Sequence, residues 1–150
     1  MNESKITQIL KKQLKSAYPE GCVLKLSDRF TAGIPDLCLT ADRRTLWIEI
    51  KYLRQESEVQ IGLTLNLRIN FKSNRTQRLF SKPQLAILRR LEHAGHAKYL
   101  IFAGQYFALT DPSTIEHYSR NRSVLFLKTQ PRLALIAEIK KLMKEICRHD

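Results

Sequence analysis

Three residues, Asp36, Glu49 and Lys51, have types and a spacing suited to chemistry on a phosphate group. Glu49 and Lys51 are two positions apart, so on a strand their side chains project from the same face. If the strand pairs with the preceding apolar run through the turn at 41–45, Asp36 and Glu49 converge. Two carboxylates make a hard oxygen site suited to Mg²⁺, which keeps several waters and accepts a phosphate oxygen. A lysine beside them can orient a water or stabilise charge on the phosphate.

The residues around Glu49 and Lys51 make this pattern more informative. Both charges alternate with Trp47, Ile48 and Ile50, which are typical of a buried strand. Charges on such a strand are unfavourable unless they are paired or bind a metal. A structural Glu–Lys pair at the edge of a sheet is the alternative that the pattern leaves open.

Helices and strands alternate along the chain, which predicts one α/β or α+β domain over 1–150 with a central mixed sheet flanked by helices. The Ser81-Lys82-Pro83-Gln84 segment has the pattern of a capping box with proline in the first turn, and so predicts the start of a helix. The predicted helices cover 3–17, 81–93, 112–118 and 132–147; the predicted strands cover 22–26, 37–40, 46–52, 98–103, 105–109 and 124–127.

Residues 53–80 form a distinct stretch. Every odd position from Ile61 to Phe71 is apolar, which predicts a strand with one half-buried face, and 73–78 has the composition of an exposed loop. The region is rich in cations and suits contact with a phosphate backbone, although a plain surface strand on a basic protein is the alternative. The residues predicted to contact DNA here are Arg68, Lys72, Arg75, Arg78 and Lys82.

The overall composition favours a polyanionic partner. The chain has 150 residues, with 26 Lys and Arg against 14 Asp and Glu, a net charge of +12. Nucleic acid suits this charge better than an anionic lipid surface, because no amphipathic membrane anchor is apparent. No segment is apolar for long enough to span a bilayer, and three widely spaced cysteines suit a reducing compartment. We therefore expect a cytoplasmic protein that does not contact a membrane.

At this point the chain resembles a known group of enzymes. Gly33-Ile34-Pro35-Asp36, followed by Glu49-Ile50-Lys51, is similar to the motif of the PD-(D/E)xK nuclease superfamily. The resemblance is strongest to the virus-type replication-repair nuclease branch (VRR-NUC) and to archaeal Holliday-junction resolvases, and it extends from Glu3 to about Gly95. It implies a restriction-endonuclease-like core, in which 53–80 is an inserted β-arm.

The resemblance also implies roles for individual residues. Asp36, Glu49 and the backbone carbonyl of Ile50 would hold one or two Mg²⁺ ions, for which Mn²⁺ can substitute, and Lys51 would be the catalytic lysine. The first helix of the family carries an acidic residue, here Glu3. A glutamine on the helix after the motif, here Gln84, would assist the site or contact DNA. In the resolvases the loop before Gly33 lies near the scissile phosphate, which implies DNA contacts by Ser27, Arg29 and Thr31.

The resulting prediction is a Mg²⁺-dependent DNA endonuclease that hydrolyses phosphodiester bonds in four-way junctions or other branched DNA. A homodimer would suit a two-fold substrate, and the viral-type resemblance makes a phage or mobile element a plausible source. Two alternatives stay open: a sequence-specific restriction-type or nicking endonuclease, and a DNA-binding module without activity. The sequence does not distinguish an endonuclease for branched DNA from the restriction-type or nicking endonuclease, because a fold does not determine its substrate.

Overall fold

The computed structural model describes residues 3–26, 33–54, 59–61, 65–146 and 148. Ser27, Arg29 and Thr31, which were predicted to contact DNA, lie outside these residues. No helix in the described ranges is long and apolar enough to cross a membrane. The helices are α1 (Glu3–Ala17), α2 (Asn74–Leu79), α3 (Lys82–Ala94), α4 (Pro112–Arg120), the 3₁₀ turn η1 (Arg132–Ala134) and α5 (Leu135–Glu145). The strands are β1 (Cys22–Lys25), β2 (Leu37–Ala41), β3 (Arg44–Tyr52), β4 (Val59–Ile61), β5 (Asn66–Asn70), β6 (His96–Ala103), β7 (Tyr106–Thr110), β8 (Val124–Lys128) and β9 (Gln130–Pro131).

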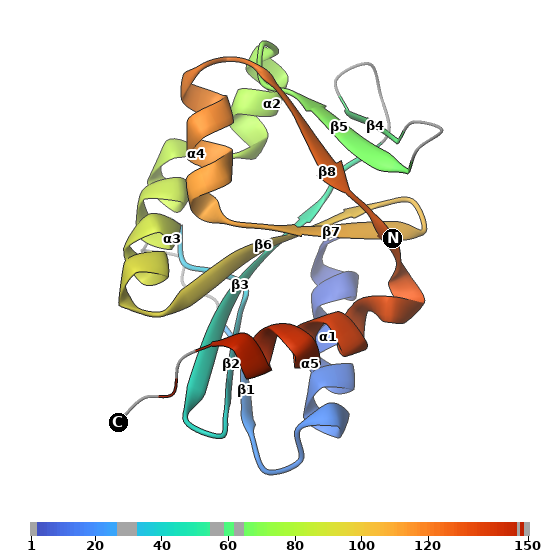
Figure 1. Ribbon diagram of the computed structural model, residues 1–150, viewed down its shortest axis with the longest axis vertical. Helices are drawn as coiled ribbons and strands as arrows, with labels where there is room; N and C mark the ends of the chain where they lie inside the picture. The colour runs from blue at the N-terminus through green and yellow to red at the C-terminus, as the bar shows by residue number, and fades with distance from the viewer. Residues whose placement is uncertain (1–2, 27–32, 55–58, 62–64, 147, 149–150) are drawn as a thin grey trace.

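A six-stranded sheet in the order β1-β2-β3-β6-β7-β9 forms the centre of the molecule (Figure 1). Its central pair, β3 and β6, is parallel, and the other neighbouring pairs are antiparallel. A second sheet, β4-β5-β8, lies beyond one end of the first. The predicted α/β class with a central mixed sheet flanked by helices is therefore confirmed.

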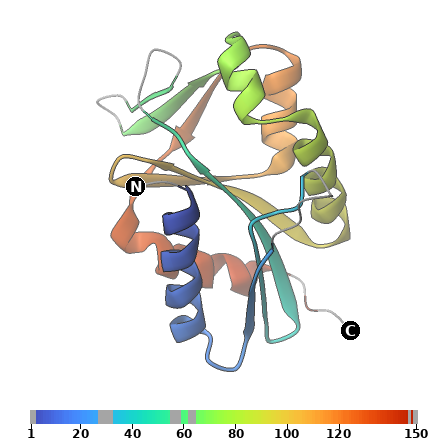
Figure 2. The ribbon, with the colours of Figure 1, turned by 180° about the vertical axis from the view of Figure 1, so that it is seen from behind.

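Helices cover both faces of the central sheet, and each face has its own apolar core. Helices α1 and α5 pack on one face, where Leu10 and Ile139 are fully buried with Ile48 and Ile50 of β3. The other face packs against α3 and α4 and continues into the second sheet. Figure 2 shows the molecule from the side on which α1 lies in front. The alternation of side chains along β3 therefore sends neighbouring residues into different cores.

The hairpin that the site requires is present. Strands β2 and β3 pair antiparallel, with Leu37 opposite Ile48, through a turn at Asp42 and Arg43. Both turn residues have positive φ, 51° and 60°, which matches the twist of two-residue hairpins. The ion pairs of Asp42 with Arg44 and Arg148, each 2.6 Å, tie this turn to the strand and to the C-terminal segment.

Residues 53–80 differ from the prediction in two respects. Of the strand expected over 61–71, Asn66–Asn70 forms β5, whereas Ile61 belongs to β4, which pairs with β5 antiparallel. Leu65 has φ of 59°, a left-handed conformation that a continuous strand excludes. The loop expected at 73–78 is instead α2, because the Ser73 side chain accepts from the backbone N–H groups of the first turn.

Strand β5 is also built into the core. Leu67, Ile69 and Phe71 are fully buried, as the alternation predicted, and β5 pairs with β8 along its whole length. Residues 66–70 of the predicted arm therefore pack as the inner strand of the second sheet.

Candidate active site

The β2–β3 hairpin brings Asp36 and Glu49 together at one edge of the paired strands. The register places Leu37 opposite Ile48, so the next position along places Asp36 opposite Glu49. The Asp36 carboxylate accepts a hydrogen bond from the backbone N–H of Ile50, at 2.8 Å from its Oδ2. This bond fixes the carboxylate beside β3, so the convergence expected from the spacing is confirmed.

Glu49 is the most deeply buried charged residue of this group. It is 3% exposed, and its Oε2 accepts a hydrogen bond from the side-chain amide of Gln84 on α3. The Lys51 ammonium lies 3.6 Å from the same oxygen, with its side chain 14% exposed. The structure thus brings Asp36, Glu49, Lys51 and Gln84 to one place, as the pattern and the resemblance predicted.

The pKa of Glu49 is raised to about 9, chiefly by burial and then by the hydrogen bond with Asp36 and the negative charge of Asp36. Glu3 adds a smaller increase, whereas the positive charge of Lys51 lowers the pKa. Two carboxylates pressed together away from water hold a proton strongly unless a cation compensates them. When both carboxylates are ionised, the site therefore has more negative charge than its single lysine balances.

Gly33 explains why Gln84 stands at this position. Its φ is 90°, and a Cβ there would lie 2.6 Å from the Cα of Gln84 and 2.8 Å from the carbonyl oxygen of Pro83. Only glycine permits this close approach with that backbone conformation. The segment leading to Asp36 thus packs directly on the first turn of α3, which places the Asp36 and Gln84 side chains around Glu49.

The start of α3 was predicted correctly, but the predicted capping box is wrong. Ser81 is the N-cap residue, yet its side chain makes no capping hydrogen bond within the described residues. Gln84 donates to Glu49 instead of returning to the helix N-terminus. A residue pattern typical of a capping box is used here to hold a buried carboxylate.

Glu3 lies near the group, although its carboxylate is turned to a backbone amide. Its Oε1 accepts from the N–H of Tyr52, at 3.1 Å, at the end of β3. The described residues contain no cluster of three or more His, Cys, Asp or Glu side chains arranged to hold a metal ion. The role of Glu3 as a metal ligand stays a prediction.

The donor set nevertheless suits a divalent cation such as Mg²⁺. Asp36 and Glu49 supply adjacent carboxylate oxygens. The backbone carbonyl of Ile50 lies on β3 directly after Glu49. Gln84 Oε1 is buried without a hydrogen-bond partner among the described residues, although its Nε2 is bonded to Glu49. Hard oxygen donors with excess negative charge are what Mg²⁺ prefers in proteins.

Tyr99 is a neighbour of the site that the sequence did not single out. It pairs with Glu49 in the parallel register of β3 and β6, and its ring packs edge-on against Phe80, 5.4 Å between centroids. Its hydroxyl is buried and has no hydrogen-bond partner within the described part of the chain. Burial raises the pKa of this hydroxyl, and the charge of Glu49 raises it further. No local pattern distinguishes Tyr99 as a neighbour of the site, because it alternates with apolar residues as a core residue does.

The predicted DNA-contacting cations lie on three different elements. Arg68 is half-buried on β5, whereas Lys72, Arg75, Arg78 and Lys82 are exposed on or beside α2 and at the start of α3. Their predicted role in DNA binding stays a prediction.

Comparison with known proteins places few limits on the chain. No family model matches it, and no curated protein matches it. Among solved structures, it is similar to Hjc, a Holliday junction resolvase from the archaeal hyperthermophile Archaeoglobus fulgidus. The two share 15% sequence identity over 85% of each chain, with a TM-score of 0.45. A likeness of this degree does not assign an activity, and membership of the VRR-NUC branch stays a prediction.

Proposed function

We propose that this protein is a Mg²⁺-dependent DNA endonuclease that cleaves branched DNA, and that it acts as a homodimer. The observation that carries the proposal is Glu49, a buried carboxylate held by Gln84 and placed against Asp36 and Lys51. A buried acid on an otherwise apolar strand is unfavourable for stability unless a cation compensates it. A site for chemistry accounts for this arrangement better than a structural ion pair, because one lysine does not balance two carboxylates.

Each residue of the site has a distinct task in the proposed reaction. Asp36 and Glu49, with the carbonyl of Ile50, would hold Mg²⁺, and Glu3 would add to the negative field at the end of β3. The ion would supply Lewis-acid polarisation of the scissile phosphate. Lys51, whose ammonium is 3.6 Å from Glu49, would orient the attacking water and stabilise charge that develops on the phosphate. Gln84 would keep the Glu49 carboxylate in place.

The charge of the chain supports DNA as the substrate. With a net charge of +12, the protein can release condensed counterions from a phosphate backbone over a large part of its surface. Backbone contacts position a protein on DNA without reading its bases, so shape is the feature that such a surface can select. Branched DNA is the substrate class that this mode of recognition favours.

Cleavage of labelled DNA tests the proposal. Four-way junction, flap and linear duplex are incubated in Mg²⁺ with the wild type and with Asp36→Ala. We expect the wild type to cut the junction and the variant to bind it without cutting. Equal cutting of all three substrates would refute selectivity for branches. Tight binding without cutting in either Mg²⁺ or Mn²⁺ would refute the enzyme and favour a DNA-binding module.

A further inference from the structure

A groove between α2, α3 and α4 lies on the opposite side of α3 from Glu49. It has a volume of about 660 Å³, and Lys82, Arg120 and Arg122 are among the residues that line it. Glu116 is the one acidic residue among the described residues that line the groove. Neither Arg120 nor Arg122 was singled out by the sequence, because they come from the end of α4, far along the chain from the predicted motif.

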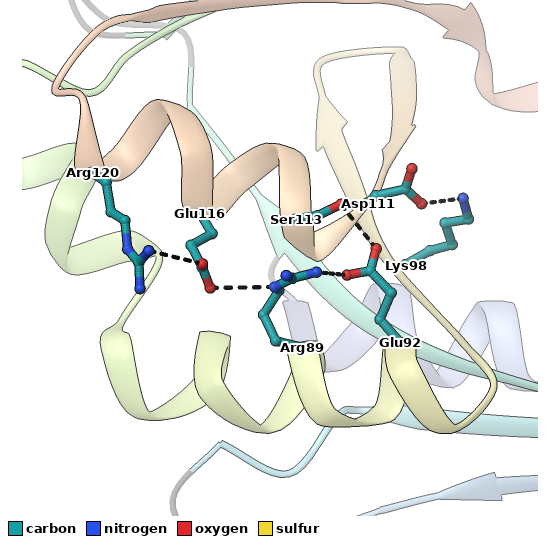
Figure 3. A network of polar contacts seen from close by, with 7 residues as sticks. All are labelled: Arg89, Glu92, Lys98, Asp111, Ser113, Glu116 and Arg120. Atoms are coloured by element: carbon teal, nitrogen blue, oxygen red, sulfur yellow. Dashed lines mark hydrogen bonds and ion pairs between the residues drawn. The ribbon is translucent and has the colours of Figure 1, made fainter.

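The negative charge of Glu116 is already compensated inside the protein. Its Oε2 lies 3.3 Å from the Nε of Arg89, and its Oε1 lies 3.4 Å from Nη1 of Arg120 (Figure 3). Arg89 also pairs with Glu92, at 2.5 Å, and Glu92 accepts a hydrogen bond from Ser113. Arg120 keeps 78% of its side chain exposed. The groove therefore presents a net positive surface.

The walls of the groove are held in a fixed arrangement. The side-chain amide of Gln77 donates to the carbonyl oxygens of Phe71 and Ser119, at 2.8 and 2.9 Å. The hydroxyl of Ser119 donates back to Gln77 Oε1 at 2.7 Å. These bonds tie α2 to α4, so the groove exists before any ligand arrives. A preformed site loses little conformational entropy when it binds.

Arg122 is held at the mouth of the groove in the same way. Its Nη2 donates to the carbonyl of Lys72, at 2.9 Å, and to Oδ1 of Asn74, at 2.8 Å. Within the described residues, no carboxylate forms an ion pair with Arg122 or Lys82. An oriented guanidinium paired only with neutral acceptors is well suited to a phosphate group.

Helix α3 separates this groove from the proposed catalytic site. Lys82 and Ala86 face the groove, whereas Gln84 bonds to Glu49 and Leu88 is fully buried. A DNA backbone held by Arg120 and Arg122 would therefore contact the protein at a place separate from Glu49.

We infer that this groove is a binding site for the phosphate backbone of the DNA substrate away from the cleaved bond, with Arg120, Arg122 and Lys82 as its cationic contacts. The inference rests on the proposed function, since it takes DNA as the ligand. It adds a second anchoring point, which would fix the direction in which the substrate crosses the catalytic site.

Binding in EDTA tests the inference without cleavage. The dissociation constant of a labelled four-way junction is measured from low to moderate salt for the wild type and for Arg120→Ala/Arg122→Ala. We expect affinity to fall about tenfold and the slope of log K against log salt to become shallower by about 2, one contact for each cation removed. The matched control is Lys140→Ala/Lys144→Ala on α5, with the same charge change on exposed residues. We expect its slope to be unchanged.

The outcomes separate the inference from the proposed function. Equal affinity and equal salt slope for the wild type and the double variant would overturn the inference that the groove binds DNA. A smaller slope in the α5 control as well would also overturn it, because the effect would then come from net charge. A wild type that binds with the expected slopes but never cuts would refute the nuclease and keep the groove. If the double variant unfolds, the salt slope is measured for Lys82→Ala instead, since Lys82 is exposed. An unchanged slope for Lys82→Ala would overturn the inference.

Discussion

Strand β3 presents two surfaces that differ sharply, although they belong to the same nine residues. Leu46, Ile48 and Ile50 point into the core under α1 and α5, and each is fully buried. On the opposite face Glu49, which accepts a hydrogen bond from Gln84 of α3, is 3% exposed, and the Lys51 side chain is 14% exposed. Burial alone therefore does not decide what a strand carries. The first face stabilises the fold, whereas the second accepts unfavourable desolvation in order to hold charge.

The largest effect that we expect is on the rate of DNA cleavage, from a change on the charged face of β3. Glu49→Gln keeps the shape of the side chain but removes the charge that would hold the cation, so cleavage of branched DNA should fall by about 1000-fold, ~4 kcal/mol of transition-state stabilisation. Single-turnover cleavage in Mg²⁺ measures this. Glu145→Gln, which neutralises an exposed carboxylate at the end of α5, should leave the rate unchanged. Undiminished cleavage by Glu49→Gln would mean that the charged face is structural.

The opposite face should show the reverse pattern. Ile48→Ala leaves a cavity in the core under α1 and should lower the free energy of unfolding by about 2–5 kcal/mol. Urea denaturation gives this value, with Leu24→Ala, half-exposed on the edge strand β1, as the control with a small loss. Folded Ile48→Ala should still cut DNA at a rate near that of the wild type. A large rate loss in folded protein would show that the two faces are not separate in function.

The two faces should also differ in their response to pH. The folded pKa of Glu49 is about 9 against an ordinary value of 4.5, so the folded state holds a proton that the unfolded state releases. Its contribution to stability is complete below pH 4.5 and is lost as the pH rises toward 9. In EDTA, the wild type should lose about 1 kcal/mol per pH unit relative to Glu49→Gln within this window. Thermal unfolding across the window measures the difference.

Repeating the thermal unfolding series in Mg²⁺ tests the same carboxylate. Saturating Mg²⁺ should reduce the loss, because it favours the ionised carboxylate. A wild type and variant with parallel pH profiles, with or without Mg²⁺, would contradict a protonated, cation-demanding Glu49.

Tyr99→Phe should produce the smallest effect. The hydroxyl is buried beside Glu49 without a partner among the described residues, so its removal should change the free energy of unfolding by less than about 1 kcal/mol, toward higher stability. Equilibrium denaturation compares it with Tyr106→Phe, whose side chain is partly exposed. A clear loss of stability would show that the hydroxyl makes a bond in solution and that this part of the face is structural.

Much of this face could be predicted from local sequence. The spacing of Asp36, Glu49 and Lys51 predicted their convergence because a hairpin and a two-residue period determine it. Gln84 came from the resemblance, while the bond it makes depends on the close packing of Gly33 against α3, which no local pattern encodes.

The errors have physical causes of the same kind. Helix α2 was missed because its six residues bury only Thr76 and show no apolar periodicity, and its start depends on the Ser73 cap. The strand predicted over 61–71 was interrupted because Leu65 adopts a left-handed conformation between β4 and β5. The groove cations could not be predicted, since Arg120 and Arg122 meet Lys82 only through the packing of α4 on α3.

The parallel pairing of β3 with β6 also has a consequence for the order in which the molecule assembles. The β2–β3 hairpin closes a short loop and can form early, whereas β6 reaches β3 only after the chain from 53 to 95 has crossed over. Before α3 and β6 pack on this face of β3, the carboxylate of Glu49 is open to water and ionised at neutral pH. Proton uptake by Glu49 should therefore be a late event of refolding, and the rate of that step should report when α3 and β6 cover this face.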